Sequence, residues 1–295
     1  MPQLLLFHYG PFQPLWQQAG PFLQCGPQMD LAGPGLHVGE PSVAAIKRAL
    51  LHRGLPGHGV LLHYTDPFLI RSAGLRGLNH WLGPKLLVCG DLHHGPAPLE
   101  TLAAYQGQEP HDGVLLTFNP MLLAAVQERL AVPVTCQPPG FFRYPTLSQH
   151  PNPVPRLIHV GRIGPHHPHR RQLVEALVQR QRIPFLHTTT DTPEQAADLY
   201  NASALVLNVP LNNDLNHRFF EVMAAGSRQV VFGSSRLLGE QQSLGERSDV
   251  HWAETIEQLE TVVQELLANP KLLHQPAPPL PCLDLKQLLA LCWAP

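Results

Sequence analysis

Short runs of apolar residues alternate with amphipathic stretches through the first half of the chain. Three stretches have the periodicity and end signals of helices, with Ser42 placed to cap the first and Pro120 at the first position of the third. Strands this apolar, separated by helices, indicate a parallel sheet covered on both faces. The predicted strands are residues 3–9, 59–64, 85–91, 113–118 and 132–136, and the predicted helices are residues 42–54, 97–106 and 120–130.

Two proline-rich segments interrupt this alternation. Residues 10–36 repeat Gly-Pro units, which predicts a long ordered loop or a series of short turns. Residues 138–155 contain prolines that can continue neither a helix nor a central strand, so we expect a domain linker there.

The alternation restarts after the linker and predicts a second α/β domain. Its expected strands are residues 156–162, 183–188, 204–209, 228–233 and 250–252, and its expected helices are residues 168–182, 192–202, 215–226 and 253–268. The predicted organisation is a domain at 1–137, the linker, a domain at 156–275, and a proline-rich strap with a terminal helix at 276–295. We expect a ligand between the two domains, at the carboxyl ends of their strands.

Composition narrows the class of protein. No apolar run approaches the ~20 residues of a membrane span, and the first strand has no basic leader, so we expect a soluble, cytoplasmic protein. The five cysteines form no CxxC pair, which argues against a disulfide framework or a zinc knuckle. The net charge is −2 with only 14% charged residues, which makes nucleic acid an improbable partner.

Two helix starts in the second half carry arginines. Arg218 lies in the first turn of one predicted helix, and Arg170 and Arg171 lie in the first turn of another. A cation there opposes the helix dipole unless an anion shares the site, and helix starts bind phosphate readily. Arg218 and Glu221 are also spaced for a local ion pair. The two interpretations are therefore a solvated pair or a diphosphate site.

Two sequence blocks in the same region resemble a known family. They are "HVGRIGPHHPHRRQLVEAL" (159–177) and "DLYNASALVLNVPLNNDLNHRFFEVMAAG" (198–226). They are similar to the carboxyl-terminal domain of the spore-maturation-type glycosyltransferases. The resemblance implies the GT-B fold, which has two facing Rossmann-like domains, and dependence on a nucleotide-sugar donor. It covers about 156–270 well and residues 84–126 more loosely.

The resemblance also implies roles for individual residues. Glu221 matches the glutamate that holds the donor ribose, a task that suits a carboxylate accepting two hydroxyl hydrogen bonds. The other implied donor-binding residues, all expected near the diphosphate, are Gly161, Arg162, Arg170, Asn216 and Arg218. The first glutamate of the wider group's E-x7-E motif falls on Asn213, which leaves open how the donor sugar is held.

A second cluster, in "VCGDLHHGP" (88–96), follows a predicted strand of the first domain. Asp91, His93 and His94 are the candidate catalytic residues, because a histidine or aspartate could remove the proton of an acceptor hydroxyl. Two alternatives are a binuclear metal site, whose further Asp and His elements the chain lacks in suitable spacing, and a histidine-rich loop capped by Asp91.

The function these features predict is transfer of a sugar, hexosyl or related, from a nucleotide-diphosphate sugar to an acceptor hydroxyl. The resemblance also implies that basic side chains and helix starts replace a metal ion, so neither a divalent metal nor a cofactor is expected. The alternative is a protein of the same fold that binds a nucleotide sugar without catalysis, or a scaffold. The acceptor is not identified by these patterns.

Overall fold

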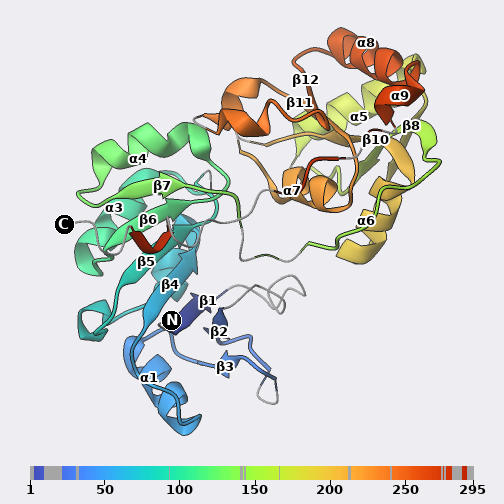
Figure 1. Ribbon diagram of the computed structural model, residues 1–295. Coiled ribbons are helices and arrows are strands. Elements are labelled where there is room, and N and C mark those ends of the chain that lie inside the picture. Colours follow the sequence, from blue (N-terminus) through green and yellow to red (C-terminus); the bar gives the residue numbers. More distant parts are fainter. Residues whose placement is uncertain are drawn as a thin grey trace. The chain divides into compact units, whose positions relative to one another are not determined.

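The computed structural model describes residues 3–9, 22–30, 33–92, 94–139, 142, 144–165, 167–211, 214–239, 241–273, 275, 277–280 and 288–290. The chain divides into two compact units, each built on its own sheet (Figure 1). The first unit is Met1–Arg143 together with Pro281–Pro295, and the second is Tyr144–Leu280.

The first unit contains a seven-stranded sheet in the order β3-β2-β1-β4-β5-β6-β7, and each neighbouring pair of strands is parallel. This is the doubly wound order, and its direction reverses between β1 and β4. The strands are β1 (Leu4–His8), β2 (Leu23–Gly26), β3 (Leu36–His37), β4 (Val60–Thr65), β5 (Lys85–Cys89), β6 (Gly113–Leu116) and β7 (Val134–Cys136).

Helices α1 (Val43–His52), α3 (Pro98–Gln108) and α4 (Leu123–Arg129) follow the amphipathic stretches of the first half. Ser42 caps α1 by accepting a hydrogen bond from the Ala45 N–H at 3.2 Å. The apolar side of α1 packs against β1 and β4, and those of α3 and α4 pack against β5 and β6. A core of this kind on parallel strands explains why those strands are almost wholly apolar.

The expectation of a loop or turns throughout residues 10–36 was wrong for the later part of this segment. Strands β2 and β3 lie there, and β2 pairs with β1 from Leu23 to Cys25. Both strands are too short to show a periodicity, and residues 10–21 lie outside the described residues. The short helices η2 (Pro67–Leu69), α2 (Ile70–Ala73) and η3 (Leu78–His80), which no predicted element anticipates, fill the stretch between β4 and β5.

The second unit contains a five-stranded parallel sheet in the order β12-β11-β10-β8-β9. The order reverses between β8 and β10, and in doubly wound sheets ligands bind at the carboxyl ends of the strands at such a reversal. The strands are β8 (Val154–Val160), β9 (Phe185–Thr188), β10 (Ser203–Asn208), β11 (Gln229–Phe232) and β12 (Val250–Ala253).

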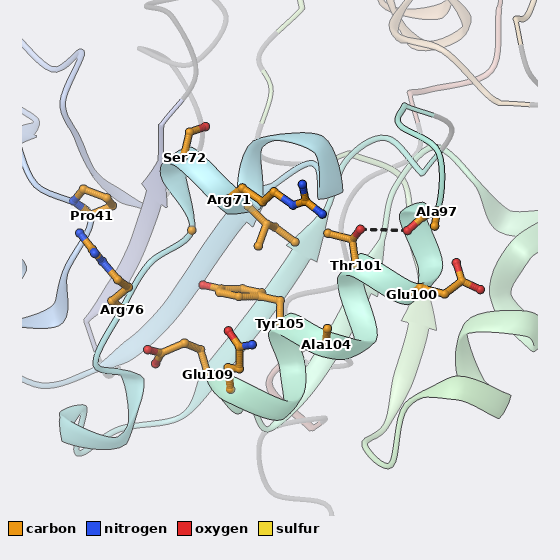
Figure 2. A pocket seen from close by; sticks show the side chains of 13 residues that line it. Pro41, Arg71, Ser72, Arg76, Ala97, Glu100, Thr101, Ala104, Tyr105 and Glu109 are labelled. Atoms are coloured by element: carbon orange, nitrogen blue, oxygen red, sulfur yellow. Dashed lines mark hydrogen bonds between the residues drawn. The ribbon is translucent and has the colours of Figure 1, made fainter.

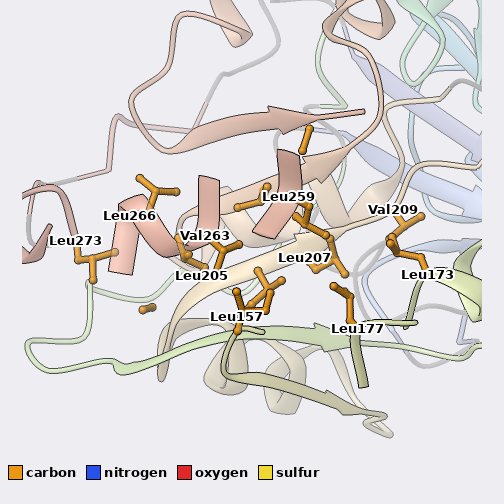
Figure 3. Packing of buried hydrophobic residues seen from close by; sticks show 14 residues of the cluster. Leu157, Leu173, Leu177, Leu205, Leu207, Val209, Leu259, Val263, Leu266 and Leu273 are labelled. Carbon is orange, nitrogen blue, oxygen red and sulfur yellow. The ribbon is translucent and has the colours of Figure 1, made fainter. Parts of the chain in front are cut away.

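Helices cover both faces of this sheet. Helices α5 (Pro168–Arg180) and α8 (Ile256–Leu267) pack on the face that presents Leu157, Leu205 and Leu207, the cluster drawn in Figure 3. Helices α6 (Pro193–Asn201) and α7 (His217–Ala224) pack on the opposite face, against Ile158 and Val206. The prediction of an α/β fold with parallel sheets is confirmed.

Residues before β8 and after α8 also pack on the second unit. The Leu147 N–H donates to the Ala224 carbonyl at 3.3 Å, and the Gln149 amide donates to the Leu273 carbonyl, at the end of α9 (Pro270–Leu273), at 2.7 Å. Half-buried Arg247 pairs with Asp249 at 2.8 Å and donates to the carbonyls of Pro278 and Pro279, which attaches the strap to this unit.

The remaining helical turns of the described chain are η4 (Pro120–Leu122), η5 (Ser235–Leu238) and η6 (Gln242–Leu244). Of the predicted terminal helix, only residues 288–290 are described, and they are helical. Within the described residues, no helix has the length and apolar character that crossing a membrane requires.

Candidate functional site

The carboxyl ends of β8 and β10 bring the predicted donor-binding residues of the second unit together. β8 ends at Val160 and leads into Gly161, whose φ of 137° lies in a region that side chains other than glycine rarely adopt. A Cβ atom at Gly161 would collide with the Arg218 guanidinium. The glycine therefore allows both the turn and the close approach of an arginine from α7.

Arg218 is held by neutral groups. Its Nη1 donates to Nε2 of His159 at 3.2 Å, and it also interacts with the side chain of Tyr200. Its Nε is buried without a hydrogen-bond partner among the described residues. An unpaired guanidinium N–H in a protein interior is costly, which favours a ligand that accepts from it.

Glu221 lies one turn further along α7 and is half-buried. Burial raises the pKa of its carboxyl, and the charge of Arg218 and a hydrogen bond with Tyr200 oppose that rise. Among the described residues, no carboxylate forms an ion pair with Arg218, although Arg218 and Glu221 influence each other electrostatically. The local ion pair that the spacing allows is thus replaced by contacts of each side chain with Tyr200.

Arg170 brings a second buried guanidinium to the same place. It lies in the first turn of α5, is only 8% exposed, and donates to the Val209 carbonyl, just beyond β10, at 3.1 Å and to the Arg162 carbonyl at 3.5 Å. Burial and the charge of Arg218 lower its pKa to about 10, against the opposing effect of Asp214. The two partly buried arginines therefore repel each other, and a bound anion would relieve that repulsion.

A network of amides fixes the start of α7. The Asn216 side chain caps the helix by accepting from the Phe219 N–H at 3.2 Å, and it donates to Asn208 at 3.1 Å. Asn208 in turn donates to Gln229 at 3.2 Å, and Gln229 donates to the Phe219 carbonyl at 2.9 Å. The position of Arg218 over the strand ends therefore depends on three buried or half-buried amides.

The structure brings five of the six predicted donor-binding side chains or backbone positions to this edge of the sheet: Gly161, Arg170, Asn216, Arg218 and Glu221. The Arg162 side chain is exposed, and it contributes a backbone carbonyl. The sequence analysis missed His159 and Tyr200. Asn213, the departure from the E-x7-E pattern, lies outside the described residues.

We expect Gly161→Ala to weaken nucleotide binding about as much as the loss of Arg218 does, while the fold survives. The added methyl group meets the Arg218 guanidinium, and alanine also disfavours the φ of 137°, so Arg218 must leave its position. The measurement is calorimetric titration with nucleoside diphosphates, and circular dichroism verifies the fold.

The matched control is Gly164→Ala, because a Cβ atom at Gly164 meets nothing within 4 Å. Equal affinities in wild type and Gly161→Ala would show that this turn does not shape the binding site.

In the first unit, the candidate catalytic residues Asp91 and His94 follow β5, beside residues that follow β4 and β6. The Asp91 N–H donates to Asp66 at 2.6 Å, and the Leu92 N–H donates to Asn119 at 3.2 Å. Half-exposed His94 lies 3.3 Å from the Asp91 carboxylate and packs its ring edge against Phe68. Such an aspartate–histidine pair could accept a proton from a hydroxyl. His93 lies outside the described residues.

The metal alternative finds no support in this part of the molecule. The described residues contain no group of three or more His, Cys, Asp or Glu side chains arranged to hold a metal ion. Independence from metals stays a prediction, because the described residues exclude His93 and His166.

The first unit also has a cavity of about 660 Å³ between α2 and α3 (Figure 2). The side chains around its Tyr105 ring include Arg71, Arg76 and Glu109, with Ala97 at the start of α3. Glu109 accepts from the backbone N–H groups of Gly77 and Leu78 at 3.0 and 2.9 Å, so this carboxylate is already bonded within the protein. The cavity has the size of a small-molecule site.

Comparisons with known proteins bear on the class of the second unit and on the fold. Residues 165–277, which lie in the second unit, match a family model described as "Glycosyl transferase-like". No curated protein matches the chain.

Three solved structures resemble this fold. Sucrose-phosphate synthase from Thermosynechococcus elongatus has a TM-score of 0.56 and 14% identity over 92% of this chain and 91% of that one. The T4 phage β-glucosyltransferase has a TM-score of 0.51 and 9% identity over the same 92% and 91%. TarM has a TM-score of 0.50 and 11% identity over 78% of this chain, which spans only 52% of TarM. At such identities the likeness shows the fold alone, and that fold is GT-B.

Proposed function

We propose that this protein is a glycosyltransferase that moves a sugar from a nucleoside-diphosphate sugar to an acceptor hydroxyl. The observation that carries the proposal is the position of Arg218. Its guanidinium lies against Gly161 at the reversal point of a parallel sheet, is held by a neutral histidine, and forms no ion pair with a carboxylate of the described residues. Such a charge is available to a diphosphate.

The donor would bind with its diphosphate between the turn at Gly161 and the start of α7. Arg218 and Arg170 supply positive charge there, and the α7 start supplies backbone N–H groups. Glu221 lies one helical turn away and would accept hydrogen bonds from the two ribose hydroxyls. Both roles follow the pattern of the family that blocks 159–177 and 198–226 resemble, which we propose is the spore-maturation-type branch.

The reaction breaks the bond between the anomeric carbon and the diphosphate oxygen, whose electron pair leaves with the diphosphate. A bond then forms between the anomeric carbon and the acceptor oxygen, which loses its proton. Arg218 and Arg170 would stabilise the departing negative charge, so we propose that no divalent metal is required. The acceptor would bind the first unit, where Asp91 and His94 could take the proton.

The test is calorimetric titration of the full chain with UDP-, GDP-, TDP- and ADP-sugars, followed by assays of donor hydrolysis. We expect one nucleotide class to bind, and Glu221→Ala to weaken that binding about 100-fold, since it removes two charge-assisted hydrogen bonds of about 1.5 kcal/mol each. Slow hydrolysis of the bound donor would support a transferase.

The matched control is Glu175→Ala, which removes an exposed glutamate from the surface of α5 and is expected to bind like wild type. Binding without any turnover would indicate the non-catalytic alternative, a nucleotide-sugar-binding module. Failure of all four nucleotide classes to bind would refute the proposed function.

A further inference from the structure

Two histidines below the proposed diphosphate site form a hydrogen-bonded chain with Arg218. His159 in β8 and His187 in β9 are paired in register, so their rings lie on the same face of the sheet. The two Nδ1 atoms are 3.1 Å apart, and Nε2 of His159 lies 3.2 Å from Nη1 of Arg218. His159 is fully buried, whereas His187 is half-buried.

This geometry allows only one arrangement of protons. A guanidinium nitrogen can only donate, so Nε2 of His159 must accept and carries no proton. An imidazole keeps at least one proton, which must then be on Nδ1 of His159. That N–H points to His187, whose Nδ1 must accept. The arginine requires this direction of both hydrogen bonds, and His187 supplies the acceptor that stabilises the Nδ1–H tautomer.

We propose that His159 is a positioning residue for Arg218, fixed as its Nδ1–H tautomer by His187, so that the guanidinium is oriented without being neutralised. A carboxylate in this place would hold Arg218 more tightly, but it would also cancel the charge that a diphosphate needs. His159 is a neutral acceptor that is itself held by the hydrogen bond with His187. It therefore orients the arginine without cancelling its charge. The positioning role of His159 rests on the proposed function, whereas the arrangement of protons on His159 and His187 does not.

The surroundings agree with a neutral His159. Burial lowers the pKa of this histidine to about 2, and the neighbouring charges of Arg218 and Arg170 act in the same direction. Arg218 is also confined on its other side, because its Nη2 packs against Gly161. The guanidinium is thus held between a backbone turn and a ring nitrogen, while its Nε remains without a partner.

The proton arrangement is tested by nuclear magnetic resonance on the full chain with 15N-labelled histidine and no ligand. Long-range correlations between ring carbon-bound protons and ring nitrogens show which nitrogen of each histidine is protonated, and His159→Gln identifies the signals of His159. We expect a neutral ring at pH 7 with its proton on Nδ1. A proton on Nε2, or on both nitrogens, would overturn the inference.

The positioning role is tested by replacing His159 in two ways. In His159→Gln the amide oxygen can occupy the place of Nε2 and accept from Arg218, whereas His159→Leu offers no acceptor. We expect the leucine variant to bind nucleoside diphosphate at least tenfold more weakly and the glutamine variant to remain within about threefold of wild type. Circular dichroism and thermal melting verify that both variants fold.

The outcomes separate this inference from the proposed function. Equal losses in both variants would assign His159 a merely structural role and overturn the positioning. If the wild type binds no nucleotide, the proposed function and the positioning role of His159 both fail. The resonance experiment still decides the tautomer of His159. His187→Asn, which keeps an acceptor near the position of Nδ1, is expected to retain the His159 tautomer, and His187→Leu is expected to lose it.

Discussion

Replacing Arg218 with alanine is expected to weaken the binding of nucleoside diphosphates by about 100-fold or more and to change the stability of the protein little. The loss of affinity corresponds to about 3 kcal/mol, the contribution of charge-assisted hydrogen bonds to a phosphate. Stability is expected to change little because the lost contacts of Arg218 with His159, Tyr200 and Glu221 are offset by relief of its repulsion from Arg170. Titration calorimetry and thermal melting measure the two effects.

Arg171→Ala is the matched control for this variant. Arg171 also lies in the first turn of a helix of the second unit, but it is exposed and pairs with Glu175 at 3.7 Å. Its removal is expected to change affinity by less than about threefold, since exposed pairs contribute little. An Arg218→Ala protein that binds normally but unfolds easily would show that this arginine is structural.

The first unit is expected to lose stability as the pH falls from 7.5 to 5.5. Burial lowers the pKa of His63 to about 3 and that of His8 to about 4, from an ordinary 6.5, although a hydrogen bond with Gln24 raises the latter somewhat. Burial also lowers the pKa of His111, which lies 3.4 Å from His63. The folded unit keeps these rings neutral, whereas the unfolded chain takes up protons below pH 6.5.

The sign and size follow from this difference. The contribution of these rings to the free energy of unfolding is fully present well above pH 6.5, where the rings are neutral in both states. It is lost as the pH falls towards the folded-state pKa values. At pH 5.5 each ring is expected to cost about 1.4 kcal/mol, or roughly 4 kcal/mol for the three. Carboxyl groups with lowered pKa values, such as those of Glu100 and Glu260, act only at lower pH.

Urea unfolding at the two pH values measures this effect. His58→Gln, which replaces an exposed histidine, should retain the full pH dependence, whereas His111→Gln should reduce it. A free energy of unfolding that does not change between pH 7.5 and 5.5 would contradict the account of these buried rings.

The periodicity of the chain was sufficient to predict most of the fold. Long apolar runs such as residues 59–64 and 204–209 became central strands because their length and composition suit only a buried position. Strands β2 and β3 escaped prediction, since four and two residues among Gly-Pro units have no readable period. Their pairing depends on β1, which is a tertiary effect.

The sequence predicted only those site residues whose role is visible within a single element of secondary structure. Arg218 and Glu221 could be singled out because the start of a helix makes a cation conspicuous. His159 and Tyr200 could not, because nothing local distinguishes a strand histidine or a helix tyrosine from core residues. His159 meets His187 across 28 residues and Arg218 across 59, through a strand register that the sequence does not display.

The most direct test of the central claim is a crystal structure of the full chain with the nucleoside diphosphate that binds most tightly. The account predicts phosphate oxygens within about 3 Å of the Arg218 guanidinium, beside the turn at Gly161, and the Glu221 carboxylate on the ribose hydroxyls. A nucleotide bound elsewhere, or an Arg218 side chain turned away from the phosphates, would contradict it.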